Sequence, residues 1–285
     1  MENKFCDLHT HSYYSDGTVS PSAIIDEAIK NGICAVALTD HNTTAGLAEF
    51  SEYAAGRDVE AVCGVELSTD FGERELHIVG LYIKPKYYAE INELTAAMQR
   101  RKEAANRLLI DKLCARGIKI TYEEASLGAR GQLNRAHIAH EMYMKGYAES
   151  IADAFRRYLD PKLGIYEPPV KLDAFETIKY LRKIGAVPVL AHPFYSLENE
   201  ENIERFLSMA APTGLVGIES RYSTHTEEMT RKISDLAKKY SLIEGGGSDF
   251  HGEKRPGVAL GLGYGDLRVP LESALTLKRF ADVEK

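Results

Sequence analysis

The 285-residue sequence has no run of about eighteen apolar residues and no apolar N-terminal segment of the signal-peptide type. We therefore expect a cytoplasmic protein that does not span a membrane. Its four cysteines form no C-x-x-C pair, and three lie in apolar runs, so we expect buried free thiols instead of disulfides or zinc ligands. Excess positive charge is missing as well: the formal net charge is -7, which argues against a general nucleic-acid scaffold. No obligate protein partner is evident.

The chain alternates short apolar runs with helical patterns, and 44% of its residues are hydrophobic, enough for a sizeable core. Strands are expected at residues 5–9, 34–38, 60–65, 76–83, 187–191, 215–218 and 242–244. Helices are expected at about 21–30, 45–55, 172–184, 202–210, 226–240 and 271–280. The linker between strands 60–65 and 76–83 is too short for a crossover helix, so this pair should form an antiparallel hairpin.

A long helical segment interrupts this alternation. Residues from about 89 to 117 have the pattern of one locally basic helix, residues 118–163 are largely helical, and no strand is expected before Ala186. The sequence therefore predicts an α/β barrel domain from residues 1–88 and 172–285, with a helical insertion from residues 89–171.

The N-terminal strand carries two histidines, His9 and His11, whose side chains point to the same side because they lie two residues apart. Asp16 follows in a Ser-Asp-Gly turn and adds a carboxylate. Two converging imidazoles at the end of a strand form part of a metal site. A single His-x-His pair is also compatible with a structural pair, so the other strands must decide.

Most of the predicted strands, the first included, end in a histidine or an acidic residue. The residues concerned are His9, His11, His41, Glu66, His192, Glu219, Asp249 and His251, and His77 would face Glu66 across the hairpin. A barrel of parallel strands collects the ends of its strands on one face, where the active site lies. We therefore expect these side chains to meet there.

Any one of these residues taken alone is better explained as a capped or hydrogen-bonded polar residue. Asp40 either binds metal directly, orients a neighbour or caps a helix. Together they predict a multinuclear metal site. Mixed imidazole and carboxylate ligands suit zinc, manganese or iron. Clustered divalent cations activate water and neutralise phosphoryl oxygens, so hydrolysis of a phosphate ester is the expected chemistry.

Several segments of the chain resemble the motifs of the PHP family, named for polymerase and histidinol phosphatase. They are Asp-Leu-His-Thr-His-Ser at 7–12 with Ser15-Asp16-Gly17, Thr39-Asp40-His41, Glu66, His77, Ala191-His192-Pro193 and Gly247-Ser248-Asp249-Phe250-His251-Gly252. Within the family, the sequence is most similar to phosphoesterases that act on nucleotides and short oligonucleotides. The features shared with them are Asp16, the insertion segment 134–139 and the Ser-Asp-Phe-His-Gly ending, although Ala136 stands where relatives usually have proline.

The resemblance implies a distorted, TIM-like (β/α)7 barrel that binds three divalent metals. One metal would be held by His9, His11, Glu66 and Asp249, a second by Asp16, His41 and His251, and a third by His77, His192 and a bridging Glu66. Asp16, His41, His192 and His251 would also act in catalysis, with Asp40 orienting neighbouring groups. The implied activity is removal of phosphate from a nucleoside monophosphate or 3′,5′-bisphosphate, or 5′ trimming of short oligonucleotides.

We expect the insertion to act as a lid that binds a substrate phosphate. The candidate substrate-binding residues are Arg130, Arg135, His137, His225 and Lys254. Arginine offers a bidentate fork for phosphate and can also stack on a base. A solvated surface charge is the alternative explanation for Arg130, and His225 either lines the pocket or caps the next helix.

Other functions remain open at this point. One is histidinol-phosphate phosphatase, and another is a non-catalytic, metal-binding PHP module. A third is an amidohydrolase, which also begins with His-x-His. That family usually adds a bridging lysine at a strand end, and the sequence has none in such a position.

Overall fold

A computed structural model describes residues 4–127 and 133–282, and it divides the chain into two compact units. The first comprises the chain up to Asn92 and from Leu172 onward, and the second comprises Glu93–Lys171. None of the helices within the described ranges is both long and apolar enough to cross a lipid bilayer.

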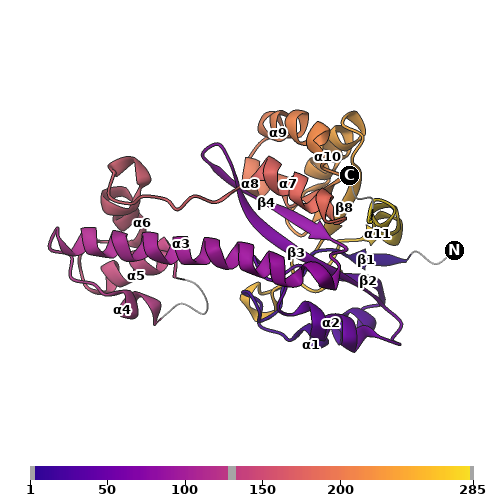
Figure 1. The fold of residues 1–285 in the computed structure, drawn as a ribbon, viewed down its shortest axis with the longest axis horizontal. Helices are drawn as coiled ribbons and strands as arrows, with labels where there is room; N and C mark the ends of the chain where they lie inside the picture. The colour runs from indigo at the N-terminus through magenta and orange to yellow at the C-terminus, as the bar shows by residue number, and fades with distance from the viewer. Residues whose placement is uncertain (1–3, 128–132, 283–285) are drawn as a thin grey trace. The chain divides into compact units, whose positions relative to one another are not determined.

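Within the described residues, the first unit is built on a nine-stranded, mostly parallel sheet with the order β8-β7-β6-β4-β3-β2-β1-β9, and β5 pairs with β3. Figure 1 labels β1 to β4 and β8. The strands are β1 (Phe5–Asp7), β2 (Ile33–Leu38), β3 (Glu60–Phe71), β4 (Arg74–Leu81), β5 (Leu172–Asp173), β6 (Val187–Leu190), β7 (Gly217–Tyr222), β8 (Ile243–Gly247) and β9 (Val269–Pro270). β3 and β4 form the expected antiparallel hairpin, and β4 is also antiparallel to β6.

The two ends of the sheet approach each other, because the segment after β1 lies beside the segment after β8. The amide of Leu8 donates to Gly246 (3.1 Å), that of Asp249 to His9 (2.9 Å), and that of His11 to Phe250 (2.8 Å). The result is an α/β fold with a nearly closed, barrel-shaped sheet, as the sequence predicts at this level.

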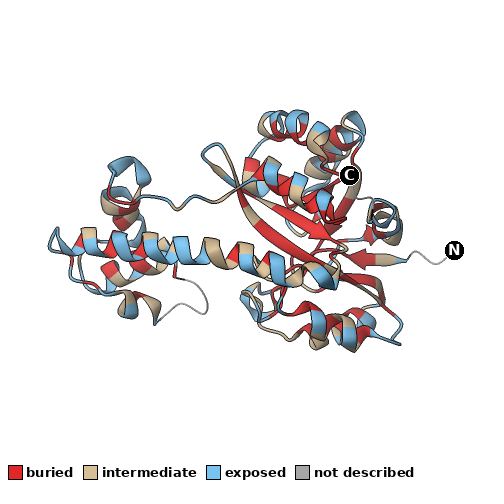
Figure 2. Ribbon diagram, in the orientation of Figure 1, coloured by how far each residue is buried: buried red, intermediate tan, exposed pale blue. Residues whose placement is uncertain are grey.

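Helices cover the outside of this sheet, and their buried sides face it (Figure 2). They are α1 (Pro21–Lys30), α2 (Leu47–Ala54), α7 (Ala174–Lys183), α8 (Pro193–Leu197), α9 (Glu200–Thr213), α10 (Glu227–Lys239) and α11 (Leu271–Lys278). The predicted start of α1 is confirmed: Ser20 Oγ accepts from the amide of Ala23 (3.0 Å), and Pro21 is the first helical residue.

Apolar side chains pack on both faces of the sheet. Val65, Leu67 and Ile78 belong to the core that includes residues of α7 and α9, whereas Val62 and Val79 belong to a second core cluster with residues of β1 and β6. Burial on both faces explains why the strands read as short continuous apolar runs. The four cysteines are free, but of the three in strands only Cys6 is fully buried.

Three strand predictions need correction. β3 continues past Glu66 to Phe71, because the hairpin with β4 extends the pairing beyond the point where β2 ends. β7 likewise runs through Glu219 to Tyr222, paired with β8. The short strand β5 lies before Ala186, where no strand was expected, and pairs with the far end of β3.

The second unit is helical, and its boundary falls within α3 (Tyr88–Cys114). It continues with α4 (Tyr122–Ser126), α5 (Arg135–Met144), α6 (Ile151–Ala154), a π-helical turn (Phe155–Leu159) and a short 3-10 turn (Pro161–Leu163). The unit has its own apolar core, which includes Leu109, Leu113, Ile138, Met142 and Leu159.

Candidate metal centre

The first unit brings together all nine residues that the sequence predicts as metal ligands. Among the described residues, four groups of potential ligands have their ligand atoms within 4.8 Å of one another. The groups are His11-Asp16-His41-His251, His9-His192-Asp249, His9-His11-Glu66 and His41-Glu66-His77. Residues separated by up to about 240 positions in sequence therefore meet at one place, because parallel strands present their ends on the same side of the sheet.

Glu66 lies at the centre of this cluster and is fully buried. Its Oε1 lies 2.7 Å from His77 Nδ1 and 2.9 Å from His192 Nε2. His77 does reach Glu66, but diagonally, because the strand register pairs Glu66 with Val79 and His77 with Ser68. Glu66 is placed at the rim by an isolated parallel bridge with His41, and the hairpin continues beyond that point.

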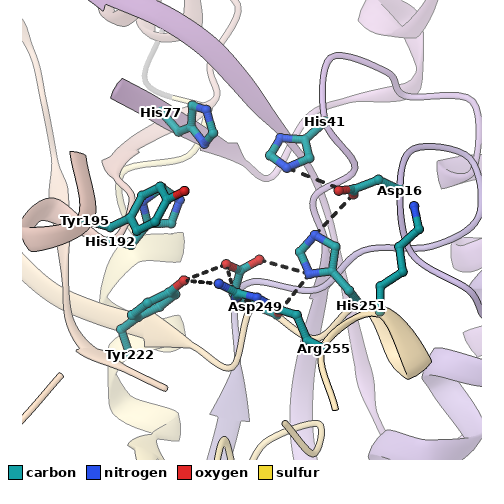
Figure 3. A pocket seen from close by; sticks show the side chains of 10 residues that line it. Asp16, His41, His77, His192, Tyr195, Tyr222, Asp249, His251 and Arg255 are labelled. Atoms are coloured by element: carbon teal, nitrogen blue, oxygen red, sulfur yellow. Dashed lines mark hydrogen bonds and ion pairs between the residues drawn. The ribbon is translucent and has the colours of Figure 1, made fainter. Parts of the chain in front are cut away.

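The loop after β1 delivers Asp16 to the cluster. Asp16 Oδ1 lies 3.1 Å from His251 Nε2 and 4.0 Å from His41 Nε2 (Figure 3). The buried carboxylate of Asp40 fixes this loop by accepting from the amide (2.7 Å) and hydroxyl (2.6 Å) of Ser12 and from the hydroxyl of Ser15 (2.6 Å). Asp40 thus contacts the loop that carries the predicted ligand.

The two oxygens of Asp249 face different neighbours (Figure 3). Oδ1 lies 3.1 Å from His11 Nε2 and 3.4 Å from His251 Nδ1. Oδ2 accepts from the hydroxyl of Tyr222 (2.7 Å) and forms an ion pair with Arg255, whose guanidinium also donates to Tyr222 Oη (3.0 Å). This division leaves one oxygen of Asp249 directed at the histidines.

The backbone is under constraint at several points of the site. His192 and Asp249 have positive φ angles of 27° and 55°, which are uncommon for residues with a side chain and often mark functional sites. Gly247 lies so close to β1 that a Cβ on it would sit 2.4 Å from the Cβ of His9. Only glycine permits this approach, so the glycine at position 247 is explained by the position of His9.

The buried ligand atoms fit divalent cations better than they fit one another. Glu66 Oε2 lies 2.9 Å from His41 Nδ1 and 3.3 Å from Nε2 of both His9 and His11. Despite these distances, none of these four atoms has a hydrogen-bond partner among the described residues. Buried polar atoms are rarely left without partners, so side chains aimed at common points are what a cation site requires. Imidazole nitrogens and carboxylate oxygens suit zinc, manganese or iron.

The electrostatics favour metal binding at His11 and Glu66. Burial, together with the nearby His251 and His41, lowers the pKa of His11 to about 3, which keeps its imidazole neutral and able to bind metal. Burial would raise the pKa of Glu66, but His41, His77 and His9 hold it well below the usual value, so the carboxylate is ionised. Burial lowers the pKa of His77, but the Glu66 carboxylate outweighs this effect and raises the pKa to about 10.

A pocket of about 360 Å³ opens onto the cluster, a size usual for a small-molecule site. It is lined by Asp16, His41, His77, His192, Tyr195, Tyr222, Asp249, His251, Lys254 and Arg255 (Figure 3). The predicted substrate-binding residue Lys254 is therefore in the pocket wall. Its neighbour Arg255 and the two tyrosines complete a rim of cationic and aromatic side chains.

The other predicted substrate-binding residues lie elsewhere or have other contacts. His225 does not cap α10, whose N-cap is Thr226; its Nδ1 lies 3.1 Å from the carbonyl oxygen of Ser220, and its ring lies 5.2 Å from that of Tyr222. Arg135 and His137 belong to the second unit and are described with it below. Arg130 lies outside the described residues.

Arg135 and His137 occupy the first turn of α5. The guanidinium of Arg135 donates to the carbonyl of Leu159 (3.1 Å) and lies 4.7 Å from the centre of the Tyr166 ring. His137 Nδ1 accepts from the amide of Asn134 (3.2 Å), which completes a capping box. Both side chains thus have structural contacts within the insertion, and their role toward substrate stays a prediction.

Some residues of the site were not assigned from the sequence. Tyr222 and Tyr195 follow no motif that would have indicated them. Asp7 stands within the first motif, but its role became visible only from its contacts: it accepts from the amides of Ser248 (2.9 Å) and Gly261 (2.7 Å).

Comparisons with known proteins agree with this architecture. The PHP domain model matches residues 7–165. A 5′-3′ exoribonuclease of Haemophilus influenzae is 30% identical over 88% of this chain and 91% of its own. A 3′,5′-nucleoside bisphosphate phosphatase of Chromobacterium violaceum is 32% identical over 90% of each chain. Among solved structures, one from Chromobacterium violaceum described as an amidohydrolase with bound sulfate and no metal is similar, with a TM-score of 0.73 and 28% identity over 98% of this chain and 99% of that one.

Proposed function

The chain belongs to the PHP domain family, and on that premise we propose that it is a metal-dependent phosphoesterase acting on nucleotides or short oligonucleotides. The reaction would be removal of phosphate from a nucleoside monophosphate or 3′,5′-bisphosphate, or 5′-3′ trimming of an oligonucleotide. The names of the two relatives, a bisphosphate phosphatase and an exoribonuclease, support this range of substrates.

One observation carries the proposal: buried imidazole and carboxylate atoms, without hydrogen-bond partners in the described part of the chain, converge beside a pocket with a cationic rim. A phosphate group carries negative charge, so it suits both the cluster, once cations are bound, and the side chains of Lys254 and Arg255. A neutral substrate would not require both a cation-binding cluster and the cationic side chains of Lys254 and Arg255.

We propose three cations per chain, of manganese, iron or zinc. The residues that would hold the first cation are His9, His11, Glu66 and Asp249; the second, Asp16, His41 and His251; and the third, His77, His192 and Glu66. This division into three follows the resemblance to the PHP family. When bound, divalent cations activate water and neutralise phosphoryl oxygens, which is the chemistry that phosphate-ester hydrolysis needs.

The chain's own side chains would bind and orient the substrate. Lys254 and Arg255 would bind phosphate oxygens, and Arg255 holds Asp249 in place through the oxygen that faces away from the histidines. Asp16, His41, His192 and His251 line the pocket and would lie closest to the scissile bond. Tyr195, which is 75% exposed, offers an aromatic surface at the pocket wall.

We further propose that the barrel is of the distorted (β/α)7 type and that the helical insertion serves as a substrate-binding lid. Arg135 and His137 would then contact a substrate phosphate. The guanidinium of Arg135 has five N–H donors, and the hydrogen bond to Leu159 uses one of them.

The test is a phosphate-release assay with added Mn²⁺ on nucleoside monophosphates, 3′,5′-bisphosphates, dinucleotides and histidinol phosphate. We expect turnover of the nucleotide substrates, and loss of that turnover in His251→Ala but not in His140→Ala, an exposed histidine of the insertion. Preferential turnover of histidinol phosphate would replace the proposed substrate class. Absence of turnover on every substrate would favour a non-catalytic metal-binding module.

A further inference from the structure

Glu219, in β7, is a buried carboxylate in contact with two predicted ligands, and it is only 2% exposed. Its Oε1 lies 2.7 Å from Nδ1 of His9, and its Oε2 accepts from the backbone amide of His192 at 2.7 Å. We propose that Glu219 is a positioning residue that aligns His9 and His192 for metal binding, so that one carboxylate serves two of the three proposed metal subsites.

The contact with His9 fixes which ring nitrogen faces the cluster. When His9 donates Nδ1–H to Glu219, the lone pair lies on Nε2. That Nε2 is buried, has no hydrogen-bond partner among the described residues, and lies 3.3 Å from Glu66 Oε2 and 3.6 Å from Asp249 Oδ1. A carboxylate behind a histidine is a common means of orienting a metal ligand and increasing its basicity.

The contact with His192 fixes a backbone that would otherwise be unfavourable. His192 has φ 27° and ψ 60°, a conformation that costs energy for a residue with a side chain. The hydrogen bond to Glu219 holds the His192 amide in this conformation, while the His192 ring places Nε2 2.9 Å from Glu66 Oε1. Glu219 thus acts on the side chain of one ligand and the main chain of the other.

The remaining subsite is held by other contacts. Asp16, His41 and His251 are positioned by the loop that Asp40 fixes, by the bridge of His41 to β3, and by the carbonyl of Asp249, 2.8 Å from His251 Nδ1. Loss of Glu219 should therefore weaken the two subsites that contain His9 and His192 and leave the subsite of Asp16, His41 and His251 intact.

The chemistry of the two contacts makes glutamine a sharp test. The His192 amide can only donate, and His9 must donate from Nδ1 if Nε2 is to bind metal. A carboxylate accepts from both, whereas the amide of Glu219→Gln has nearly the same shape but only one accepting atom. Glu219→Asp keeps two accepting oxygens on a side chain one methylene shorter, so it cannot reach both partners.

The proposal rests on the proposed function, because it assumes that the cluster binds metal. The experiment is a titration of metal-free protein with Mn²⁺, in which electron paramagnetic resonance reports free Mn²⁺ and so gives the number of sites and their Kd values. Substitution of groups that orient metal ligands typically weakens binding about 10- to 100-fold. We expect this weakening of Mn²⁺ binding at two sites in both Glu219 variants, with the Kd of one site unchanged.

Glu244→Gln is the matched control, since Glu244 lies in the adjacent strand β8 and its carboxylate accepts from Ser234 Oγ (2.6 Å).

The outcomes separate the inference from the function. Wild-type protein that binds no Mn²⁺ would overturn both. Wild-type binding with unchanged Kd values in E219Q or E219D would overturn the role of Glu219 alone, and so would an equal loss in E244Q. Thermal unfolding of the metal-free proteins is measured in parallel: if E219Q is unfolded, E219D takes its place, and uniform loss of all three sites in a folded variant would also contradict the proposal.

Discussion

The seam of the barrel, where the segments after β1 and β8 lie side by side, depends on Asp7. This fully buried carboxylate at the end of β1 contacts the segment after β8 and the C-terminal loop. Its Oδ1 accepts from the amides of His9 (3.2 Å) and Ser248 (2.9 Å). Its Oδ2 accepts from the hydroxyl of Ser248 (2.5 Å) and the amide of Gly261 (2.7 Å). Asp7→Asn keeps the shape of the side chain but replaces one accepting oxygen with a donating NH₂ group.

The expected loss follows from these four contacts. The best orientation of asparagine keeps its oxygen toward the His9 and Ser248 amides and lets the Ser248 hydroxyl turn to accept. The Gly261 amide then has no acceptor, which costs roughly 1–3 kcal/mol, and the remaining bonds lose their charged partner. Burial raises the pKa of Asp7 against the effect of its hydrogen bonds from Ser248, so neutralisation returns part of this loss. We expect a net destabilisation of about 2–3 kcal/mol.

For a domain of this size, about 2–3 kcal/mol corresponds to a fall in Tm of roughly 4–12 °C. The assay is thermal unfolding followed by circular dichroism, with a chelator present for all proteins so that metal binding does not contribute. Asp26→Asn is the matched control: Asp26 pairs with Arg57 at the surface, and its loss should change stability by less than about 1 kcal/mol. If the Tm of Asp7→Asn equals that of the Asp26→Asn control, the hydrogen bonds of Asp7 do not stabilise the seam.

Three further predictions concern activity. Treatment with a chelator should abolish phosphate release and added Mn²⁺ should restore it, as measured by phosphate assay; full activity in the chelated protein would exclude a metal-dependent reaction. Lys254→Ala should raise KM for nucleotides about 2- to 5-fold with a smaller effect on kcat, since one exposed charge contact contributes up to about 1 kcal/mol; an unchanged KM would remove Lys254 from the substrate site. Arg135→Ala should lower kcat/KM for nucleotides well beyond its effect on a small aryl phosphate, and equal losses on both substrates would contradict the lid; Arg116→Ala, at an exposed arginine of the same unit, is its control.

Much of the fold could be predicted from local patterns. The hairpin of β3 and β4 followed from a linker too short for a crossover, and the start of α1 followed from Ser20 and Pro21. Strand lengths were harder to predict, because pairing with a distant partner extends β3 past Glu66 and adds β5. Such pairing depends on tertiary contacts that no local window contains.

The meeting of the predicted ligands could be anticipated for a simple reason: parallel strands end on one face, whatever lies between them. The side chains around the ligands could not be anticipated in this way. Tyr222 and Arg255 reach Asp249 only because β7 and the loop after β8 lie side by side, and Glu219 reaches His9 across the sheet. Their roles depend on three-dimensional neighbours, which the order of residues does not reveal.

The central claim is that His9, His11, Glu66 and Asp249, with their neighbours in the cluster, hold divalent cations. A crystal structure of Mn²⁺-soaked protein, with anomalous diffraction measured at the manganese edge, tests it most directly. We predict anomalous peaks between the imidazole and carboxylate groups of this cluster. A fully soaked crystal with peaks only elsewhere, or with none, would contradict it.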